Sequence, residues 1–309
     1  MSQQNTEIRA PNAALCGTPS LYDQDTLRHQ WLRTASIEIS THDISHTGAA
    51  AKFLLAGTEV LIPWLPDSTP KEMLRAAATL RDAGLTPVPH LAARRLETME
   101  QAKSLFEALV KNAGVHSALL IAGDLDHPAG PFDSALSLLR SGLAESAGIR
   151  SIGIAGYPEG HPQIEPSLLQ RHLMQKLEYL GSRGLHGFVV TQFCFDAQAV
   201  LHWLAALRKD GIAAPVRIGV AGPARLRKLL SMGLRCGIGN SLRALKGKAG
   251  ALNALLSTHG PEELIAELAR GEALAPSVAE LSLHLFAFGG AEITARWLAQ
   301  SSAAAEIRR

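Results

Sequence analysis

The sequence predicts an α/β protein that folds as a single (β/α)8 barrel of the TIM type. A short apolar run, a turn and an amphipathic helical stretch recur along the chain, giving eight βα units in about 270 residues. Several of the runs are continuously apolar, as at 118–121, which is typical of parallel strands covered by helices. No shift in composition indicates a linker between domains. A doubly wound sheet is the alternative, because strand order cannot be derived from these patterns.

Each element of this barrel has a place in the sequence. Residues 1–30 lack periodicity and predict an N-terminal arm, the barrel occupies 31–300, and the Ala-rich, charged segment 301–309 predicts a flexible tail. The stretch 240–270 adds one or two further helices before the last strand. Strands are expected at 36–40, 59–65, 86–92, 117–123, 151–156, 187–193, 215–221 and 281–288, and helices at 71–83, 96–112, 132–146, 166–180, 197–209 and 223–232.

The composition excludes several classes of protein. Of the 309 residues, 47% are hydrophobic, which is ample for a buried core. The net charge of +2, with no basic run interleaved with aromatics, argues against nucleic acid or an anionic membrane as a partner. The polar N-terminus is not a signal peptide, and no stretch is long enough to span a membrane. Three cysteines without a CxxC pair suit a reducing compartment, so we expect a cytoplasmic protein.

The segment 155–162, Ala-Gly-Tyr-Pro-Glu-Gly-His-Pro, follows the apolar run 151–154 and includes the end of the strand expected at 151–156. Its glycines permit backbone conformations closed to other residues, and its prolines prevent a helix from forming. The segment therefore predicts a rigid loop that presents Tyr157 and His161. Loops at the carboxyl ends of strands carry the active sites of barrels. The alternative is a well-made turn without a functional role.

Glu38 is the most informative single residue of the first strand. It alternates with Ile37 and Ile39, so its side chain points to the opposite face and, in a barrel, into the interior. A carboxyl group there is costly unless it is paired or has a raised pKa, and a raised pKa suits a general acid. The alternative is a structural ion pair with Arg33 or His42.

Further polar residues stand at expected strand ends. Gly123 would let a flat ligand approach the backbone, whereas Asp124 alone is most simply a turn or capping residue. Gln192 can both donate and accept at the edge of an amide-like or pterin-like ring, or be a satisfied buried amide. Two histidines, His90 and His284, lie on the third and last strands.

Several motifs of other chemistries are missing. No set of His, Cys, Asp and Glu has metal-ligand spacing, so we expect no metal. Neither a phosphate-binding P-loop nor a nucleophile elbow occurs. The glycine pair at 237–239 lacks the third glycine of a dinucleotide fingerprint, although it could cap a helix or hold a small anion.

Taken together, these residues resemble the methylenetetrahydrofolate reductase family. Its members carry, in order, a glutamate on strand 1, "HL" after strand 3, "GD" after strand 4, the loop "YPE-x-HP" and "TQ-x-x-F" at strand 6. The resemblance covers about residues 36–300, and the strand 5 and strand 6 motifs are the specific ones. The matching residues here are Glu38, His90-Leu91, Gly123-Asp124, Tyr157-Pro158-Glu159-Gly160-His161-Pro162 and Thr191-Gln192-Phe193-Cys194-Phe195.

The resemblance implies a flavoprotein that reduces 5,10-methylenetetrahydrofolate to 5-methyltetrahydrofolate with NAD(P)H, by ping-pong hydride transfer through FAD. It makes Glu38 the general acid toward folate and places Asp124 beside the flavin. A homo-oligomer is also expected. The remaining roles implied are flavin contacts for His90, Gly123, Tyr157 and His161, and pterin binding for Gln192. The family's flavin phosphate contacts on the helix before strand 6 are not recognisable here, and Lys176 is the candidate for that role.

This chain departs from the family pattern in four places. The usual "FEFFPP" of strand 1 reads Ile-Glu-Ile-Ser-Thr-His at 37–42, and "TYGAGGS" after strand 2 is replaced at 63–68. Ala122 stands where an arginine often precedes "GD". A glutamine and a phenylalanine that contact substrate and nicotinamide align with Arg225 and Leu229. The departures motivate an alternative function, a flavin- or folate-binding barrel of one-carbon metabolism with altered or no reductase activity.

Two further expectations complete this interpretation. The sequence ends soon after the last barrel unit, so we expect a bacterial-type member without the C-terminal regulatory domain of eukaryotic members. A lyase or aldolase on the same fold would need a Schiff-base lysine or a metal at a strand end, and no expected strand end carries an obvious lysine.

Overall fold

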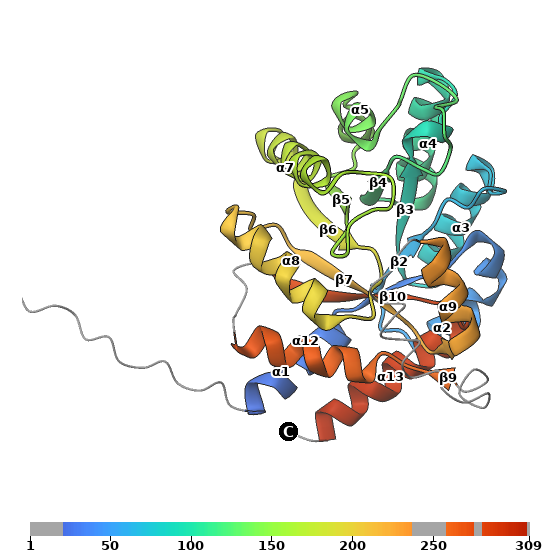
Figure 1. The fold of residues 1–309 in the computed structure, drawn as a ribbon. Helices are drawn as coiled ribbons and strands as arrows, with labels where there is room; N and C mark the ends of the chain where they lie inside the picture. The colour runs from blue at the N-terminus through green and yellow to red at the C-terminus, as the bar shows by residue number, and fades with distance from the viewer. Residues whose placement is uncertain (1–20, 237–257, 275–279, 308–309) are drawn as a thin grey trace, which may run out of the picture.

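Eight parallel strands close into a barrel in the order β1-β10-β7-β6-β5-β4-β3-β2 (Figure 1). The computed structural model describes residues 21–236, 258–274 and 280–307. The first and last strands close the barrel, with Ser36 in register with His284 and Ile37 with Leu285. The predicted barrel is therefore confirmed, and the doubly wound alternative is excluded.

All eight predicted strands are present. Five of them end two or three residues earlier than predicted, because the backbone leaves the parallel ladder to form the loops at the carboxyl end of the barrel. Outside the barrel, β8 (Ala224–Arg225) and β9 (Thr258–His259) form a short antiparallel pair. The barrel strands are β1 (Ser36–Glu38), β2 (Glu59–Ile62), β3 (Thr86–Ala92), β4 (Ser117–Ile121), β5 (Ser151–Gly156), β6 (His186–Thr191), β7 (Val216–Ala221) and β10 (Leu281–Phe286).

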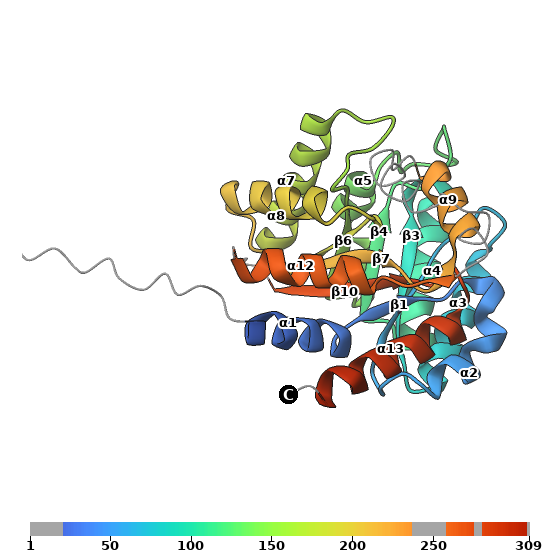
Figure 2. The same ribbon diagram turned by 60° about the horizontal axis from the view of Figure 1, so that its bottom comes forward.

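Helices surround the strands in both views (Figures 1 and 2). Capping residues set their starts: Thr69 and Glu72 form a reciprocal capping box at α3, and Asp196 accepts from two backbone amides at α8. The elements are α1 (Leu21–Arg33), η1 (Thr41–His46), α2 (Thr47–Ala51), α3 (Pro70–Asp82), η2 (Ala93–Arg95), α4 (Met99–Ala113), α5 (Ala135–Arg140), α6 (Leu143–Ala147), α7 (Pro166–Ser182), α8 (Ala197–Lys209), α9 (Leu226–Arg235), α12 (Glu262–Leu274) and α13 (Ala291–Ile307).

Two helix predictions need correction. The single helix expected at 132–146 is the two helices α5 and α6, because the chain turns at Gly142 with φ of +70°. The helix expected at 223–232 is α9, displaced by three residues because β8 comes first. Residues 240–257 of the helical stretch expected at 240–270 lie outside the described residues, as does the glycine pair at 237–239. Residues 262–270 of that stretch belong to α12.

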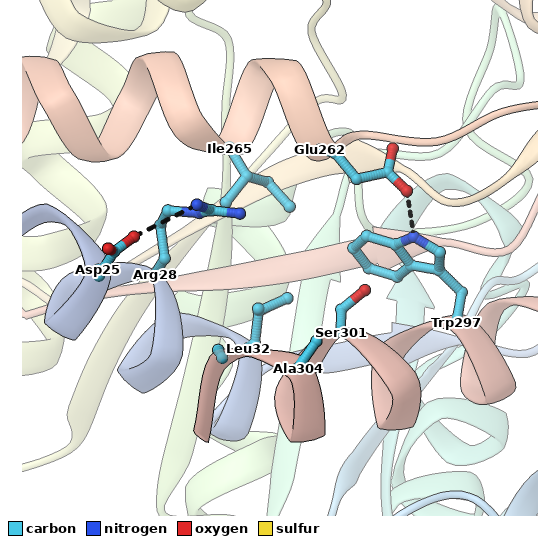
Figure 3. Close-up of a pocket in the computed structure, with 9 residues that line it drawn as sticks. Asp25, Arg28, Leu32, Glu262, Ile265, Trp297, Ser301 and Ala304 are labelled. Carbon is cyan, nitrogen blue, oxygen red and sulfur yellow. Dashed lines mark hydrogen bonds and ion pairs between the residues drawn. The ribbon is translucent and has the colours of Figure 1, made fainter. Parts of the chain in front are cut away.

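The ends of the described chain are more ordered than the sequence indicates. Residues 21–30 of the expected arm belong to α1, and α13 continues through Ile307 into the expected tail. Trp31 of α1 is only 2% exposed, so this helix is part of the packed outer layer. Figure 3 shows α1, α12 and α13 around a cavity of about 190 Å³, where Trp297 donates to the Glu262 carboxylate and Arg28 pairs with Asp25.

The barrel wall has two different faces. Outward side chains form the large core between strands and helices, whereas a second, smaller cluster lies inside the barrel. At the amino end of the interior, Arg217 stacks on the Phe188 ring at 3.9 Å and forms an ion pair with Glu59 at 2.6 Å. The inner cluster consists of Leu61, Val88, Leu119, Phe188 and Val190. No helix in the described part of the chain combines the length and apolar character needed to cross a bilayer.

We predict that Gly219→Ala destabilises the barrel by roughly 1–3 kcal/mol or more, because the new methyl group would overpack the wall. An added Cβ would lie 2.4 Å from the Thr191 carbonyl oxygen, and Gly219 also donates its N–H to the Thr191 hydroxyl. Urea unfolding measures the effect. The control is Gly181→Ala in α7, where no heavy atom lies within 4 Å of the new Cβ; it should stabilise by about 0.5–1 kcal/mol. Equal stability of the two variants would contradict the prediction.

Candidate active site

Glu38 is the last residue of β1, and its carboxyl group is at the centre of a buried polar cluster. Its Oε2 lies 3.9 Å from Nε2 of His90 on β3 and 3.9 Å from Nε2 of His284 on β10. Neither of these nitrogens has a hydrogen-bond partner, and both are buried. Nδ1 of His284 lies 3.0 Å from the hydroxyl of Ser36, two residues before Glu38 on the same face of β1. Three strands thus bring one carboxyl and two imidazoles together inside the barrel.

Burial keeps this cluster uncharged. It raises the pKa of Glu38 above its usual value, although proximity to His90 partly offsets the effect. Burial likewise lowers the pKa of His90 to about 4 and that of His284 to about 3, with the positive charge of Arg217 adding to the effect on His284. Burial thus favours the neutral imidazoles and shifts the Glu38 carboxyl toward its protonated form. Such a carboxyl group can act as a general acid.

The alternative partners considered for Glu38 lie elsewhere. His42 is on η1, where its Nε2 lies 3.2 Å from the carboxylate of Asp67 in the loop after β2. Glu38 instead lies 3.9 Å from each of the two histidines. Glu38 faces the interior of the barrel, as its alternation with Ile37 and Ile39 indicates.

Asp124 is held by an arginine that the sequence analysis did not find. Oδ1 of Asp124 accepts from Nε and Nη2 of Arg95 at 2.9 and 2.7 Å, and Nη1 of Arg95 donates to the Pro66 carbonyl. Arg95 therefore connects the loops after β2, β3 and β4. It supplies a guanidinium group at the loop where Ala122 replaces the arginine of the family pattern. The sequence feature that could have indicated this arginine is the pair Arg94-Arg95, which comes shortly after the third strand.

The loop after β5 presents Tyr157 and His161 together. Their rings meet edge to face, with centroids 5.3 Å apart. Burial raises the pKa of Tyr157 and lowers that of His161. Gly160 has φ of +82°, as a tight turn requires, whereas Gly156 serves close packing, since a Cβ there would lie 2.8 Å from Val189. The loop borders a cavity of about 340 Å³ between α7 and α8.

Lys176 lies farther along α7, in an unusual setting for a lysine. Its amine is largely buried, and burial lowers its pKa to about 8. Positive neighbours surround this part of the helix: Lys176, Arg171 and Arg140 all lower the pKa of His172, after the larger effect of burial. Arg140 comes from α5, which packs against α7. No acidic partner of Lys176 is found in the described part of the chain, so the positive charges on this part of α7 and on Arg140 suit an anion.

The remaining predicted residues are less closely grouped. Gln192 follows β6, and its Oε1 accepts from the backbone N–H of Phe193. Arg225 is exposed on β8. Leu229 is 3% exposed and packs in an apolar cluster with Ala221 and Ala224. Gly123 has φ of +94° at the strand 4 loop. Within the described residues, no group of three or more His, Cys, Asp or Glu side chains is arranged to hold a metal ion.

The fold and the site define a class of protein: a (β/α)8 barrel with a largely buried carboxyl group at the carboxyl end of its first strand. Two histidines lie beside this group, and the loops after β4 and β5 carry an aspartate bound by arginine and a pair of packed rings. The family model for methylenetetrahydrofolate reductase matches residues 59–233. This chain belongs to the methylenetetrahydrofolate reductase family.

Individual relatives agree with this assignment. The chain is 32% identical over 151 residues to a probable methylenetetrahydrofolate reductase (NADPH) of Caenorhabditis elegans, covering 47% of this chain and 22% of that protein. It is 27% identical over 130 residues to methylenetetrahydrofolate reductase 2 of Saccharomyces cerevisiae, covering 38% and 21%. The chain thus matches only about a fifth of the length of these relatives.

One solved structure supports the fold alone. It is an uncharacterized protein from Clostridium thermocellum, described as binding two copies of 5-methyl-5,6,7,8-tetrahydrofolic acid. The TM-score is 0.55 at 11% sequence identity, over 91% of this chain and 99% of that one.

The buried histidines predict a dependence of stability on pH. The pKa of each is lowered in the folded state, so the unfolded chain binds more protons below pH 6.5 and stability falls as pH decreases toward 4. Each histidine contributes a slope of roughly 1 kcal/mol per pH unit. Glu38 acts in the opposite direction, because its pKa is raised. We expect His90→Gln and His284→Gln each to flatten the fall in stability between pH 6.5 and 4.5 in urea unfolding.

The control for this experiment is His116→Gln, which changes an exposed histidine on the segment before β4. It should keep the wild-type dependence on pH. If all three variants follow the wild-type curve, the two barrel histidines are not the source of the dependence.

Proposed function

We propose that this protein reduces 5,10-methylenetetrahydrofolate to 5-methyltetrahydrofolate with NAD(P)H, using FAD in a ping-pong reaction. The observation that carries the proposal is the largely buried Glu38 carboxyl, which lies 3.9 Å from Nε2 of each of two histidines and whose pKa burial raises. Opening the five-membered ring of the folate requires a proton on a nitrogen, and a carboxyl group with a raised pKa can supply it. Family membership supports the reaction class.

The described residues offer a fitting set of groups for FAD. The positive charges of Lys176, Arg171 and Arg140 near His172 suit the diphosphate, and the Tyr157 and His161 rings suit a flat ring system. Gly123, with its positive φ, presents bare backbone at the strand 4 loop. When bound, FAD supplies the hydride chemistry that links NAD(P)H to the folate. The chain's own residues bind it, orient it and provide the proton.

Within this proposal the other predicted residues have separate tasks. Asp124, fixed by Arg95, places a negative charge near the flavin, and His90 stands between that region and the acid. Gln192 offers its amide to the pterin ring edge. Arg225, at the rim of the barrel, contacts the substrate or the nicotinamide. Leu229 provides apolar packing on the same side of the site.

The first experiment separates the two half-reactions. Purified protein should bind FAD and turn yellow, lose its flavin absorbance with NADH or NADPH under anaerobic conditions, and recover it with methylenetetrahydrofolate. Protein that stays colourless after incubation with FAD would refute the proposal. Turnover of NADH with menadione but none with folate would favour the second candidate, a barrel with altered or no reductase activity. The burial of Leu229, where the family has a contact residue, is the observation behind that candidate.

We predict that Glu38→Gln leaves FAD binding and reduction by NAD(P)H intact but slows folate reduction by about 10²–10⁴-fold, the usual contribution of a general acid. Glutamine keeps the size and the hydrogen bonding of the side chain and removes only the titratable proton. Stopped-flow measurement of each half-reaction tests this, with flavin reduction as the internal control. If folate reduction stays within a few-fold of wild type, another group is the acid.

We also predict that Lys176→Met weakens FAD binding by about 10–100-fold, because the buried amine loses a charge-assisted hydrogen bond to phosphate. Titration of flavin-free protein with FAD, followed by fluorescence, measures the affinity. Lys103→Met on the exposed face of α4 removes the same charge and should bind FAD as wild type does. Identical affinities for the two variants would remove Lys176 from the proposed FAD site.

A further inference from the structure

A buried serine–histidine contact lies beside Glu38 and can orient its carboxyl group. Ser36 and Glu38 lie on the same face of β1, and Ser36 is the register partner of His284 on β10. The Ser36 hydroxyl lies 3.3 Å from the Leu283 carbonyl oxygen and 3.0 Å from Nδ1 of His284. Ser36 is 2% exposed and His284 is 0% exposed. Water therefore has no ready access to this pair.

These distances favour one tautomer of His284. The Ser36 hydroxyl has one proton to donate and contacts two groups, the Leu283 carbonyl and Nδ1 of His284. Because a carbonyl can only accept, both contacts are hydrogen bonds only if the hydroxyl donates to Leu283. The hydroxyl oxygen then accepts from Nδ1–H of His284. Nε2 is left with its lone pair, buried and without a partner, and directed at Oε2 of Glu38. A carboxylate cannot satisfy that lone pair, whereas a protonated carboxyl group can.

We propose that Ser36 and His284 are positioning residues that hold Glu38 as an oriented, protonated acid. Ser36 fixes the Nδ1–H tautomer, and Nε2 of His284 accepts the hydrogen bond from the carboxyl O–H of Glu38. The present separation of 3.9 Å exceeds hydrogen-bond length and closes with a small movement of the Glu38 side chain. Catalytic contacts commonly tighten when substrate binds.

The charged surroundings of His284 support this arrangement. Titratable or charged groups face the cluster from three other strands: His90 from β3, Arg217 from β7 and Glu59 from β2. Arg217 disfavours a charged imidazole at His284, and its pairing with Glu59 at 2.6 Å keeps that charge at the amino end of the barrel. His90 presents a second unpartnered Nε2 to the same oxygen of Glu38, but no hydroxyl is found at its other nitrogen in the described residues.

The proton balance is simple. In turnover, which rests on the proposed function, the Glu38 O–H breaks and its proton goes to a folate nitrogen. The resulting carboxylate takes a proton from solvent when the site opens between turnovers. His284 stays neutral throughout and changes only the partner of its Nε2. No oxidant or reductant is involved in this step.

The deciding experiment reads the tautomer directly. Protein labelled with ¹⁵N-histidine is examined by two-bond ¹H–¹⁵N NMR between pH 6 and 8, with His284→Gln used to assign the signal. We expect His284 to be neutral with its proton on Nδ1, and Ser36→Ala to move that proton to Nε2. A wild-type His284 with its proton on Nε2, or a charged one, would overturn the proposal. So would a Ser36→Ala spectrum that leaves the tautomer unchanged.

A matched control exists in the same barrel. Ser151 on β5 lies 3.1 Å from Nδ1 of its own register partner, His186 on β6, so Ser151→Ala removes the same kind of contact away from Glu38. It should leave the His284 signals in place. Infrared difference spectra follow the acid itself: a protonated-carboxyl C=O band that Glu38→Gln abolishes should persist in Ser151→Ala. In Ser36→Ala it should weaken at neutral pH, because Nε2–H then stabilises the carboxylate.

Kinetics provide the functional readout. A general acid must be protonated, so folate reduction falls as pH rises through the pKa of Glu38. In Ser36→Ala that fall should move to lower pH by on the order of one unit, with flavin reduction by NADH unchanged. Ser36→Thr keeps a hydroxyl group and should restore the wild-type profile. Wild-type protein without folate turnover but with the Nδ1–H tautomer would refute the proposed reaction and leave the positioning role of Ser36 and His284 standing. Normal turnover with the other tautomer would refute that positioning role alone.

Discussion

The pairing of β1 with β10 is the contact on which the site depends. It joins residues 248 positions apart, Ser36 and His284, and places them side by side in the closed wall. If β1 stood at the edge of an open sheet, Glu38 would be hydrated and would have the pKa of an ordinary surface carboxyl. Closure surrounds it with strands on both sides and leaves its side chain only 16% exposed. The same closure that satisfies the edge strands therefore creates the buried acid.

The barrel interior separates its charges along its length. At the amino end, Arg217 and Glu59 form a close ion pair, and the guanidinium group also stacks on Phe188. At the carboxyl end, Glu38 and the two histidines are all driven toward their neutral forms by burial. A charged pair and a neutral acid cluster can share one interior because the first is paired locally. The apolar inner residues, such as Leu61 and Val88, lie in the same interior as these groups.

In this chain, an arginine beside the strand 4 aspartate comes from a different loop than the family pattern indicates. The strand 4 loop has Ala122 where the family often has an arginine, yet Asp124 is clamped by Arg95 from the segment after β3. Arg95 additionally holds Pro66, in the loop that replaces the family's usual strand 2 motif. Arg95 thus binds both of the loops in which the sequence departs from the family pattern. Because the loops of a barrel converge at one end, a charge lost from one loop can be supplied by its neighbour.

The sequence by itself determined the eight strands, most of the helices and the inward direction of Glu38. Hydrophobic periodicity records which face of each element is buried, so these features are local and can be derived from spacing. It could not show that α1 packs as a helix or that α5 and α6 are separate. Only the tertiary structure decided the partners of Glu38 and Asp124. Ser36, His284 and Arg95 belong to strands and loops far apart in the chain, and their contacts exist only because the barrel closes. The raised pKa of Glu38 is likewise a result of burial in the folded barrel, and the spacing of residues along the chain does not predict it.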